Sequence, residues 1–319
     1  MPSPRLHVAD IVSLSIGVAW GLSFVLGKYI LSFLDPISYV AITTTSAGVI
    51  LSIYVVLRSR RLRLALHWRV LVLGVVLAAA ATAQLFGLAL SPPGVAGLIA
   101  DLTIVLTPAL GFAVRRTRVR PRTALAACLA LGGSAALAMT RHGLSVRPGD
   151  LLVMAGAVLY SLHATLLDGA RAEEGVLETT AGELLTAGLC AAVAMAALSR
   201  PWESAPPPPV LWLAIAFEVV VSTLLGYAVQ GVAQRRGGST RFALVTSVDG
   251  PAALAFGVAL FAERVTAVNL VGAALVLAGV LTTHLGPAGE EAPPATRVPI
   301  PTPALRRAAV ATPSTAAPP

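Results

Sequence analysis

The chain has 319 residues, a mean hydropathy of +0.81 and only 12% charged residues. A soluble domain carries about 25% charged residues, so this composition excludes an ordinary soluble protein and indicates a membrane-spanning one. The net charge of +8 does not favour a nucleic-acid-binding protein, because the arginines lie at the ends of long apolar runs, where they can touch lipid head groups.

In chain order, the apolar runs predict ten membrane-spanning helices, because roughly 20 apolar residues cross the hydrocarbon region and its backbone polar groups must be satisfied within each segment. Residues 1–10 are a predicted cytoplasmic N-terminus, and residues 286–319, rich in Pro and Ala, are a predicted disordered cytoplasmic tail. The predicted spans are Ile11–Phe33, Pro36–Leu57, Val70–Leu90, Val95–Val114, Thr123–Thr140, Asp150–Leu167, Glu178–Leu198, Val210–Val232, Arg241–Phe261 and Ala267–Leu285.

The basic residues predict the orientation. With ten spans, eighteen of the 23 basic residues fall on one face and four on the other, while Lys28 lies within a span. Lys and Arg are retained on the cytoplasmic side, so both termini are predicted to be cytoplasmic. The abundance of Ala, Arg, Gly and Pro is typical of a GC-rich bacterial genome, and we expect the protein in a bacterial plasma membrane.

The two halves of the chain repeat one another. Residues 103–108 (TIVLTP) correspond to residues 246–251 (TSVDGP), and residues 20–23 (WGLS) correspond to residues 160–163 (YSLH). Each half holds five predicted spans, an odd number, so the two copies must insert upside down relative to each other. Such inverted repeats are typical of secondary transporters, whose substrate site lies near the midplane where the repeats meet.

These residues carry a resemblance to a known family. The chain resembles the drug/metabolite transporter superfamily, and within it the EamA-type members with ten helices. The resemblance covers about residues 11–285 and rests on residues 20–24 followed by Lys28, residues 34–36, Pro251, residues 260–266 and residues 272–279. It implies an all-α polytopic membrane protein of two inverted five-helix repeats, residues 11–140 and 150–285, which moves small metabolites, amino acids or drugs by alternating access.

Polar residues inside the spans are the candidate site. A charged group at the bilayer centre costs about 2.5–3.5 kcal/mol on insertion scales, so each one needs a function or a partner. The candidates for substrate binding or coupling are Trp20, Ser23, Lys28, Gln84, Asp101, Tyr160, His163, Glu218, Tyr227 and Asp249.

Glu218 is the first of these candidates. At helical spacing it shares a face with Ser222, Thr223, Tyr227 and Gln230, which predicts a cavity-lining carboxylate for a cationic group or a proton. The alternative is a neutral, hydrogen-bonded carboxyl.

Asp249 precedes Gly250 and Pro251. Proline removes a backbone donor, so the ninth span is predicted to be either broken at a binding site or only kinked. Asp101, one to two turns before Pro108, has the same two interpretations.

The remaining candidates also have two interpretations. Lys28 is expected either to attract a substrate carboxylate or to pair with Asp35 or a head group. His163 is either a proton relay or hydrogen-bonded packing, and Glu183 is expected to be solvated near the cytoplasmic end of its span. Trp20 and Tyr160 occupy equivalent depths in the two repeats, where they line a cavity or fill the core.

Signatures of enzymes are missing from the sequence. Cys128 and Cys190 lie in apolar runs without metal-ligand spacing, and residues 21–28 are one residue too long for a phosphate loop. We therefore expect no catalytic residue, no metal, no cofactor and no nucleic-acid partner. The predicted partners are the lipid bilayer and a small-molecule substrate, with proton coupling and homodimer formation left open. The leading hypothesis is a secondary transporter. The alternatives are a non-transporting receptor or scaffold and an intramembrane lipid-modifying enzyme.

Overall fold

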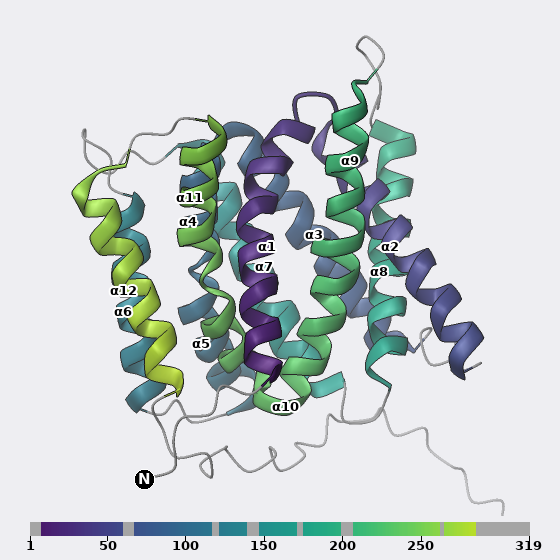
Figure 1. Cartoon of the computed structure of the whole chain (residues 1–319). Helices are drawn as coiled ribbons and strands as arrows, with labels where there is room; N and C mark the ends of the chain where they lie inside the picture. Colours follow the sequence, from purple (N-terminus) through teal and green to yellow (C-terminus); the bar gives the residue numbers. More distant parts are fainter. Residues whose placement is uncertain are drawn as a thin grey trace, which may run out of the picture.

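The structure, a computed structural model, describes residues 8–59, 67–116, 121–138, 147–170, 175–198, 207–261 and 265–284. Within these ranges the chain is an all-helical bundle without strands (Figure 1). The predicted disordered tail, residues 286–319, and the first residues of the predicted N-terminus lie outside the described residues.

Helices cover all ten predicted apolar runs, but not as ten simple rods. Six segments are long and apolar enough to cross a membrane, and one of them, Pro209–Leu260, has 52 residues and includes the predicted eighth and ninth spans. Thr103–Val114 and Ala267–Gly279 are shorter apolar helices. The elements are α1 (Val8–Ile30), α2 (Pro36–Ser59), α3 (Trp68–Leu90), α4 (Pro93–Ala100), α5 (Thr103–Arg115), α6 (Pro121–Ala138), α7 (Pro148–Ala170), α8 (Val176–Leu198), α9 (Pro209–Phe217), η2 (Glu218–Leu225), α10 (Gly226–Thr246), α11 (Asp249–Phe261) and α12 (Ala267–His284).

Two predicted spans are interrupted at similar places in the two halves. The fourth span is divided into α4 and α5 by a turn at residues 101–102, and the ninth is divided into the end of α10 and α11 by a turn at residues 247–248. Pro251 occupies the third position of α11, where its missing N–H is not needed by the helix. The ninth span is therefore interrupted shortly before Pro251, and the fourth span shares this feature.

The predicted eighth span contains an eight-residue π-helix, η2, between α9 and α10. No pattern in the sequence indicates this π-helix. After the π-helix, α10 continues beyond Val232, the predicted end of the eighth span. It turns sharply at Gly238, whose φ of 75° and ψ of 166° suit glycine. The predicted loop between the eighth and ninth spans is thus reduced to a kink at one residue.

Helices that correspond between the two halves pack against each other or face the same neighbours. α2 packs on α8 and α6 packs on α12, the outlying pairs at the two edges of the bundle in Figure 1. Glycines bring these pairs close: Gly48 faces Leu185 while Gly188 faces Thr45, and Gly133 faces Gly272 while Gly279 faces Ala126. In both pairs residue numbers rise along one helix as they fall along the other, so corresponding helices run antiparallel.

The polar contacts at the two ends of the bundle show the same inversion for α1 and α7. At one end, Arg241 Nη2 binds Asp10 Oδ2 at 3.0 Å, and Ser239 Oγ donates to Asp168 Oδ2 at 2.6 Å. The start of α1 and the end of α7 therefore meet there. At the other end, Lys28 of α1 meets the end of α3, and Ser91 Oγ donates to Asp150 Oδ1 in the first turn of α7 at 2.6 Å.

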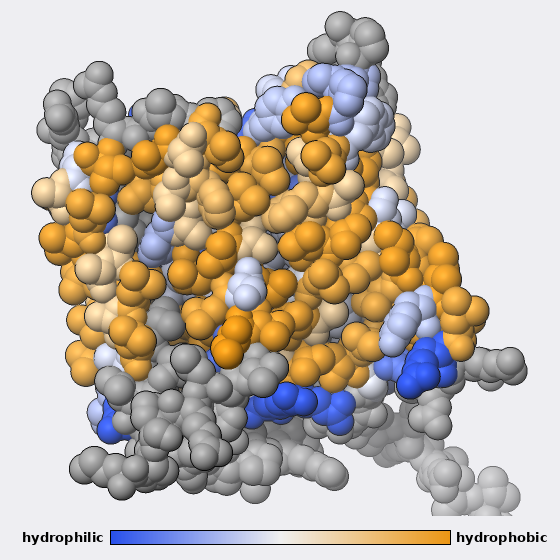
Figure 2. All heavy atoms as spheres, in the orientation of Figure 1, coloured by the Kyte–Doolittle hydropathy of each residue, from blue (hydrophilic) through white to orange (hydrophobic). Residues whose placement is uncertain are grey.

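The surface of the bundle matches a membrane protein. Figure 2 shows a broad apolar (orange) band, with hydrophilic (blue) residues along the lower edge of the described surface. Following the helices from the Asp10–Arg241 contact places most of the described arginines at that end, which we call the arginine-rich end. They are Arg58, Arg69, Arg115, Arg116, Arg122, Arg235, Arg236 and Arg241.

Candidate functional site

A cavity of about 200 Å³ lies between the two halves of the chain. Its wall comes from α1, α2, α3 and the α4–α5 break in the first half, and from α7, η2, α10 and the start of α11 in the second half. This is more than ten times the roughly 15 Å³ that one water needs. The cavity is therefore shared by both halves and lies where both helix breaks are found.

Most of the predicted candidates meet at this cavity. Of the ten, Lys28, Asp101 and His163 are not among the residues that line it. Those that line it are Trp20, Ser23, Gln84, Tyr160, Glu218, Tyr227 and Asp249. The predicted polar face of the eighth span is also present, since Ser222, Thr223 and Gln230 line the cavity beside Glu218.

Glu218 is the first residue of the π-helix and is 4% exposed. The hydroxyl groups of Ser23, Tyr39 and Ser222 are in hydrogen-bonding contact with its carboxyl group. Its Oε1 atom is buried and accepts no hydrogen bond from the residues that the structure describes. A buried acceptor without a donor is costly, so this carboxyl is a candidate partner for a donor or a cation.

Trp20 connects α1 to the π-helix. Its Nε1 donates to the carbonyl oxygen of Ser222 at 3.0 Å. The ring lies edge-on to Phe242, with centroids 5.8 Å apart, and is tilted against Tyr227 at 6.4 Å. The close approach needs Gly226, because a Cβ atom there would lie 2.9 Å from Trp20 Nε1.

Asp101 and Asp249 mark the two helix breaks. Asp101 lies in the turn between α4 and α5 and is 2% exposed, while Asp249 begins α11 and lines the cavity. Their carboxyl groups are hydrogen-bonded to each other. The structure therefore brings these two predicted candidates together, and a hydrogen bond between two carboxyl groups would require a proton on one of them.

Lys28 is hydrogen-bonded to backbone carbonyl groups at the end of another helix. Its Nζ donates to the carbonyl oxygens of Leu88, Ala89 and Ser91 at 2.9, 2.8 and 3.1 Å. These carbonyls end α3, where the helix leaves acceptors unsatisfied and carries partial negative charge. Asp35, the partner that the sequence suggested, accepts from the backbone N–H groups of Ile37 and Ser38 and so caps the start of α2.

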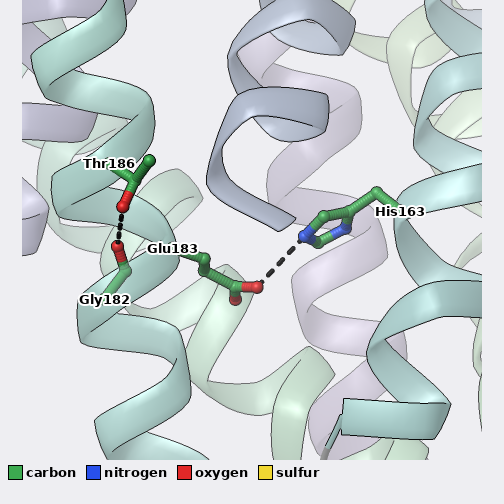
Figure 3. Close-up of polar contacts among 4 residues, drawn as sticks. All are labelled: His163, Gly182, Glu183 and Thr186. Carbon is green, nitrogen blue, oxygen red and sulfur yellow. Dashed lines mark hydrogen bonds and ion pairs between the residues drawn. The ribbon is translucent and has the colours of Figure 1, made fainter. Parts of the chain in front are cut away.

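His163 and Glu183 form a buried pair next to the cavity wall. His163 Nε2 lies 3.1 Å from Glu183 Oε2, and both side chains are 0% exposed (Figure 3). The His163 ring also lies edge-on to Tyr227, with centroids 6.2 Å apart. The expectation of a solvated Glu183 was therefore wrong. The carboxyl lies on the face of α8 that packs against the bundle, where His163 on α7 reaches it.

Sequence reasoning missed several residues of the cavity wall. Tyr39, Thr43 and Thr44 come from the first three turns of α2, and Phe242 comes from α10 beyond the Gly238 kink. Neutral hydroxyls and aromatic rings are common in membrane helices, and their position at the cavity follows only from how the helices pack. Among the described residues, no group of three or more His, Cys, Asp or Glu side chains is placed to hold a metal ion.

Comparisons with known proteins agree with this architecture. The model of the EamA-like transporter family matches the chain twice, at residues 7–139 and 147–285. A solved structure, described only as the crystal structure of a protein, is similar with a TM-score of 0.70 and 20% sequence identity, covering 86% of this chain and 96% of that chain. At that identity the likeness concerns the fold alone. No curated protein matches the sequence. Because the family model matches well over half of the chain, this multi-pass membrane protein belongs to the EamA-like transporter family.

Proposed function

We propose that the protein is a secondary transporter that exports a small metabolite, amino acid or drug across the bacterial plasma membrane by alternating access. The observation that carries the proposal is the cavity, whose wall is shared by the two halves and includes both helix breaks. Helix breaks at matched places in two repeats are typical of transporter substrate sites.

We also propose ten membrane spans, arranged as two inverted repeats with both termini and the arginine-rich end in the cytoplasm. The antiparallel course of α1 and α7, α2 and α8, and α6 and α12 supports the inversion, and the gathering of arginines at one end supports the orientation. A reporter fused after Thr140 is expected to read periplasmic, and one fused at Arg120 is expected to read cytoplasmic. The reverse pattern would overturn the orientation.

The polar contacts at the two ends suggest how access alternates. The Asp10–Arg241 and Ser239–Asp168 contacts hold the arginine-rich end together, and the Ser91–Asp150 and Lys28 contacts hold the opposite end. Opening the cavity to either side requires the contacts on that side to break. Of these, the Asp10–Arg241 and Ser91–Asp150 contacts join the two halves, so rocking of the halves about the cavity would break one of these two contacts while keeping the other.

The hydrogen-bonded pair of Asp101 and Asp249 is our proposal for proton coupling. It lies at the breaks of both halves, so a relative movement of the halves changes the distance between the two carboxyl groups. Separating the carboxyl groups removes the acceptor of the shared proton, which can then leave to the open side. Substituting Asn at either position is expected to uncouple transport from a pH gradient.

Flux into proteoliposomes tests the function. We expect the purified protein to move at least one solute of a panel of cations, zwitterions, anions and neutral metabolites. Glu218→Gln is expected to lower that flux at least tenfold, while Glu178→Gln, a carboxyl outside the cavity wall in the first turn of α8, leaves it unchanged. A folded protein that moves no member of the panel would count against a transporter. Loss of function on deleting the residues after Gly286 would favour the scaffold alternative.

A further inference from the structure

The charge of the cavity wall distinguishes among the possible substrates. Among the described residues that line it, none is Lys, Arg or His, and two carry carboxyl groups, Glu218 and Asp249. The nearest intramembrane cation of the first half, Lys28, donates to three carbonyl oxygens at the end of α3. An anionic group in the cavity would therefore meet like charge without a basic side chain to balance it.

Helix N-termini could supply positive charge instead, but each of the two at the breaks has a carboxyl-bearing residue at its start or two residues before it. The breaks expose the N-termini of α5 and α11, which carry partial positive charge. Asp101 lies two residues before the start of α5, and Asp249 Oδ1 accepts from the N–H of Gly250 at 2.9 Å at the start of α11. The last residues of α4 and α10, Ala100 and Thr246, also line the cavity, and helix C-termini favour cations.

The aromatic part of the wall suits a cation with apolar substituents. Trp20, Tyr160 and Tyr227 surround the same space as Glu218, and Tyr39 and Phe242 add to the wall. The faces of aromatic rings attract cations, Trp most strongly, and desolvation increases this attraction. The free Oε1 atom of Glu218 supplies the opposite charge within the same wall.

We infer that the substrate of this cavity is a small organic cation, an ammonium group bearing alkyl substituents and no carboxylate. Glu218 is the counter-ion, held by the hydroxyls of Ser23, Tyr39 and Ser222, and the rings of Trp20, Tyr160 and Tyr227 bind the alkylammonium surface. The inference rests on the proposed transport function for its biological meaning, but cation binding is measurable without any flux.

Three probes of similar size and different charge test the inference with the purified full-length protein in lipid nanodiscs. Choline carries a trimethylammonium group, 3,3-dimethyl-1-butanol is its neutral isostere, and glycine betaine adds a carboxylate to the same head group. We expect choline to bind at least tenfold more tightly than either of the other two by isothermal titration. Equal or tighter binding of the alcohol or of betaine would overturn the inference, and this arm needs no variant to fold.

Variants then locate the binding. Glu218→Gln is expected to weaken choline binding at least tenfold and Trp20→Leu severalfold, while Glu178→Gln leaves it unchanged. Unaltered binding in a folded Glu218→Gln protein would refute the role of this carboxyl. Flux of a zwitterion without choline binding would support the transport function and refute the cation inference. Choline binding that depends on Glu218, with no flux of any solute, would support the cation inference and count against the transport function.

Discussion

At the scale of single residues, Gly226 allows the close approach between α1 and the π-helix. A Cβ atom at this position would lie 2.9 Å from Trp20 Nε1 and 3.3 Å from the indole ring carbons. We expect Gly226→Ala to push the ring away and to lengthen or break the hydrogen bond from Trp20 to Ser222. Overpacking of this kind costs about 1–3 kcal/mol, so the thermal unfolding temperature should fall and ligand affinity with it.

The control for this substitution is Gly169→Ala. Gly169 lies near the end of α7 and has no atom within 4 Å of an added Cβ. Because Ala favours the helix over Gly, this variant should be as stable as the parent or more stable. Equal stability and affinity of the two variants would show that Trp20 does not depend on Gly226.

The buried pair of His163 and Glu183 gives a second prediction for single residues. Glu183→Leu leaves the His163 ring, whose Nδ1 is already without a partner among the described residues, with its Nε2 unpaired as well. Leaving a buried polar group unsatisfied costs about 1–3 kcal/mol. We expect the double variant His163→Leu, Glu183→Leu to unfold at a higher temperature than Glu183→Leu alone. A double variant whose loss equals the sum of the two single losses would refute the pairing.

Residues near Glu218 could be predicted from the sequence because helical spacing alone places them on one face. The partners of Lys28 and Glu183 could not, since each is on another helix. Lys28 finds its partners at the end of α3, and Glu183 finds His163 on α7. A sequence shows the cost of an intramembrane charge, but the packing of the helices decides how that cost is met.

At the scale of helices, glycine contacts hold α6 against α12. A Cβ atom at Gly133 would lie 2.5 Å from the carbonyl oxygen of Gly272 and 2.7 Å from the nitrogen of Val276. Backbone atoms cannot move aside as a flexible side chain can, so Gly133→Leu should force the two helices apart. Small residues of this kind permit close packing in membranes, and we expect a clear loss of thermal stability in detergent.

The neighbouring residue provides a matched control. Gly132 is exposed and has nothing within 4 Å of an added Cβ, so Gly132→Leu changes the same helix by the same amount without meeting α12. It should leave the melting temperature close to that of the parent. If both leucine variants were equally stable, the contact with α12 would not hold the helices together.

The sequence predicted the positions of the helices better than it predicted their interruptions. Long apolar runs predicted where helices lie, and Pro251 indicated either a break or a kink near the start of α11. The π-helix had no such signal, because Glu218–Leu225 is composed of residues that an α-helix also accepts. Its position coincides with a contact to another helix, the bond from Trp20 to the Ser222 carbonyl. π-helical turns are often found at functional sites, which agrees with its place in the cavity wall.

At the scale of the whole molecule, a polar contact at each end of the bundle joins the two halves. The sequence predicted the inverted arrangement from an odd number of spans in each half. It could not predict which side chains join the halves, because Asp10 and Arg241, or Ser91 and Asp150, are far apart in the chain. In the proposed alternating access, these contacts would determine which end of the cavity is closed, and their strengths would have to be similar.

Weakening the contact at one end should therefore favour the conformation that is open at that end, and weakening the contact at the other end should favour the opposite conformation. The Asp10–Arg241 ion pair is partly exposed, with side chains 9% and 32% accessible, so Asp10→Asn should remove about 1 kcal/mol or less. A difference of 1.4 kcal/mol changes a conformational ratio tenfold, so a shift of up to about fivefold toward opening at the arginine-rich end is expected. Ser91→Ala, which removes the hydrogen bond to Asp150, should favour opening at the opposite end.

Thiol labelling can measure this shift. In a protein whose Cys128 and Cys190 are replaced by Ala, a single cysteine in place of Thr246 reports on the cavity wall. A membrane-impermeant thiol reagent applied to the arginine-rich side should react faster in Asp10→Asn and more slowly in Ser91→Ala than in the parent, and the order should reverse from the other side. Charge reversal gives the internal check, because Asp10→Arg combined with Arg241→Asp restores the pair and should restore the parent rate. If both variants sped labelling from both sides, the contacts would serve general stability, and the ends of the bundle would not act as alternating gates.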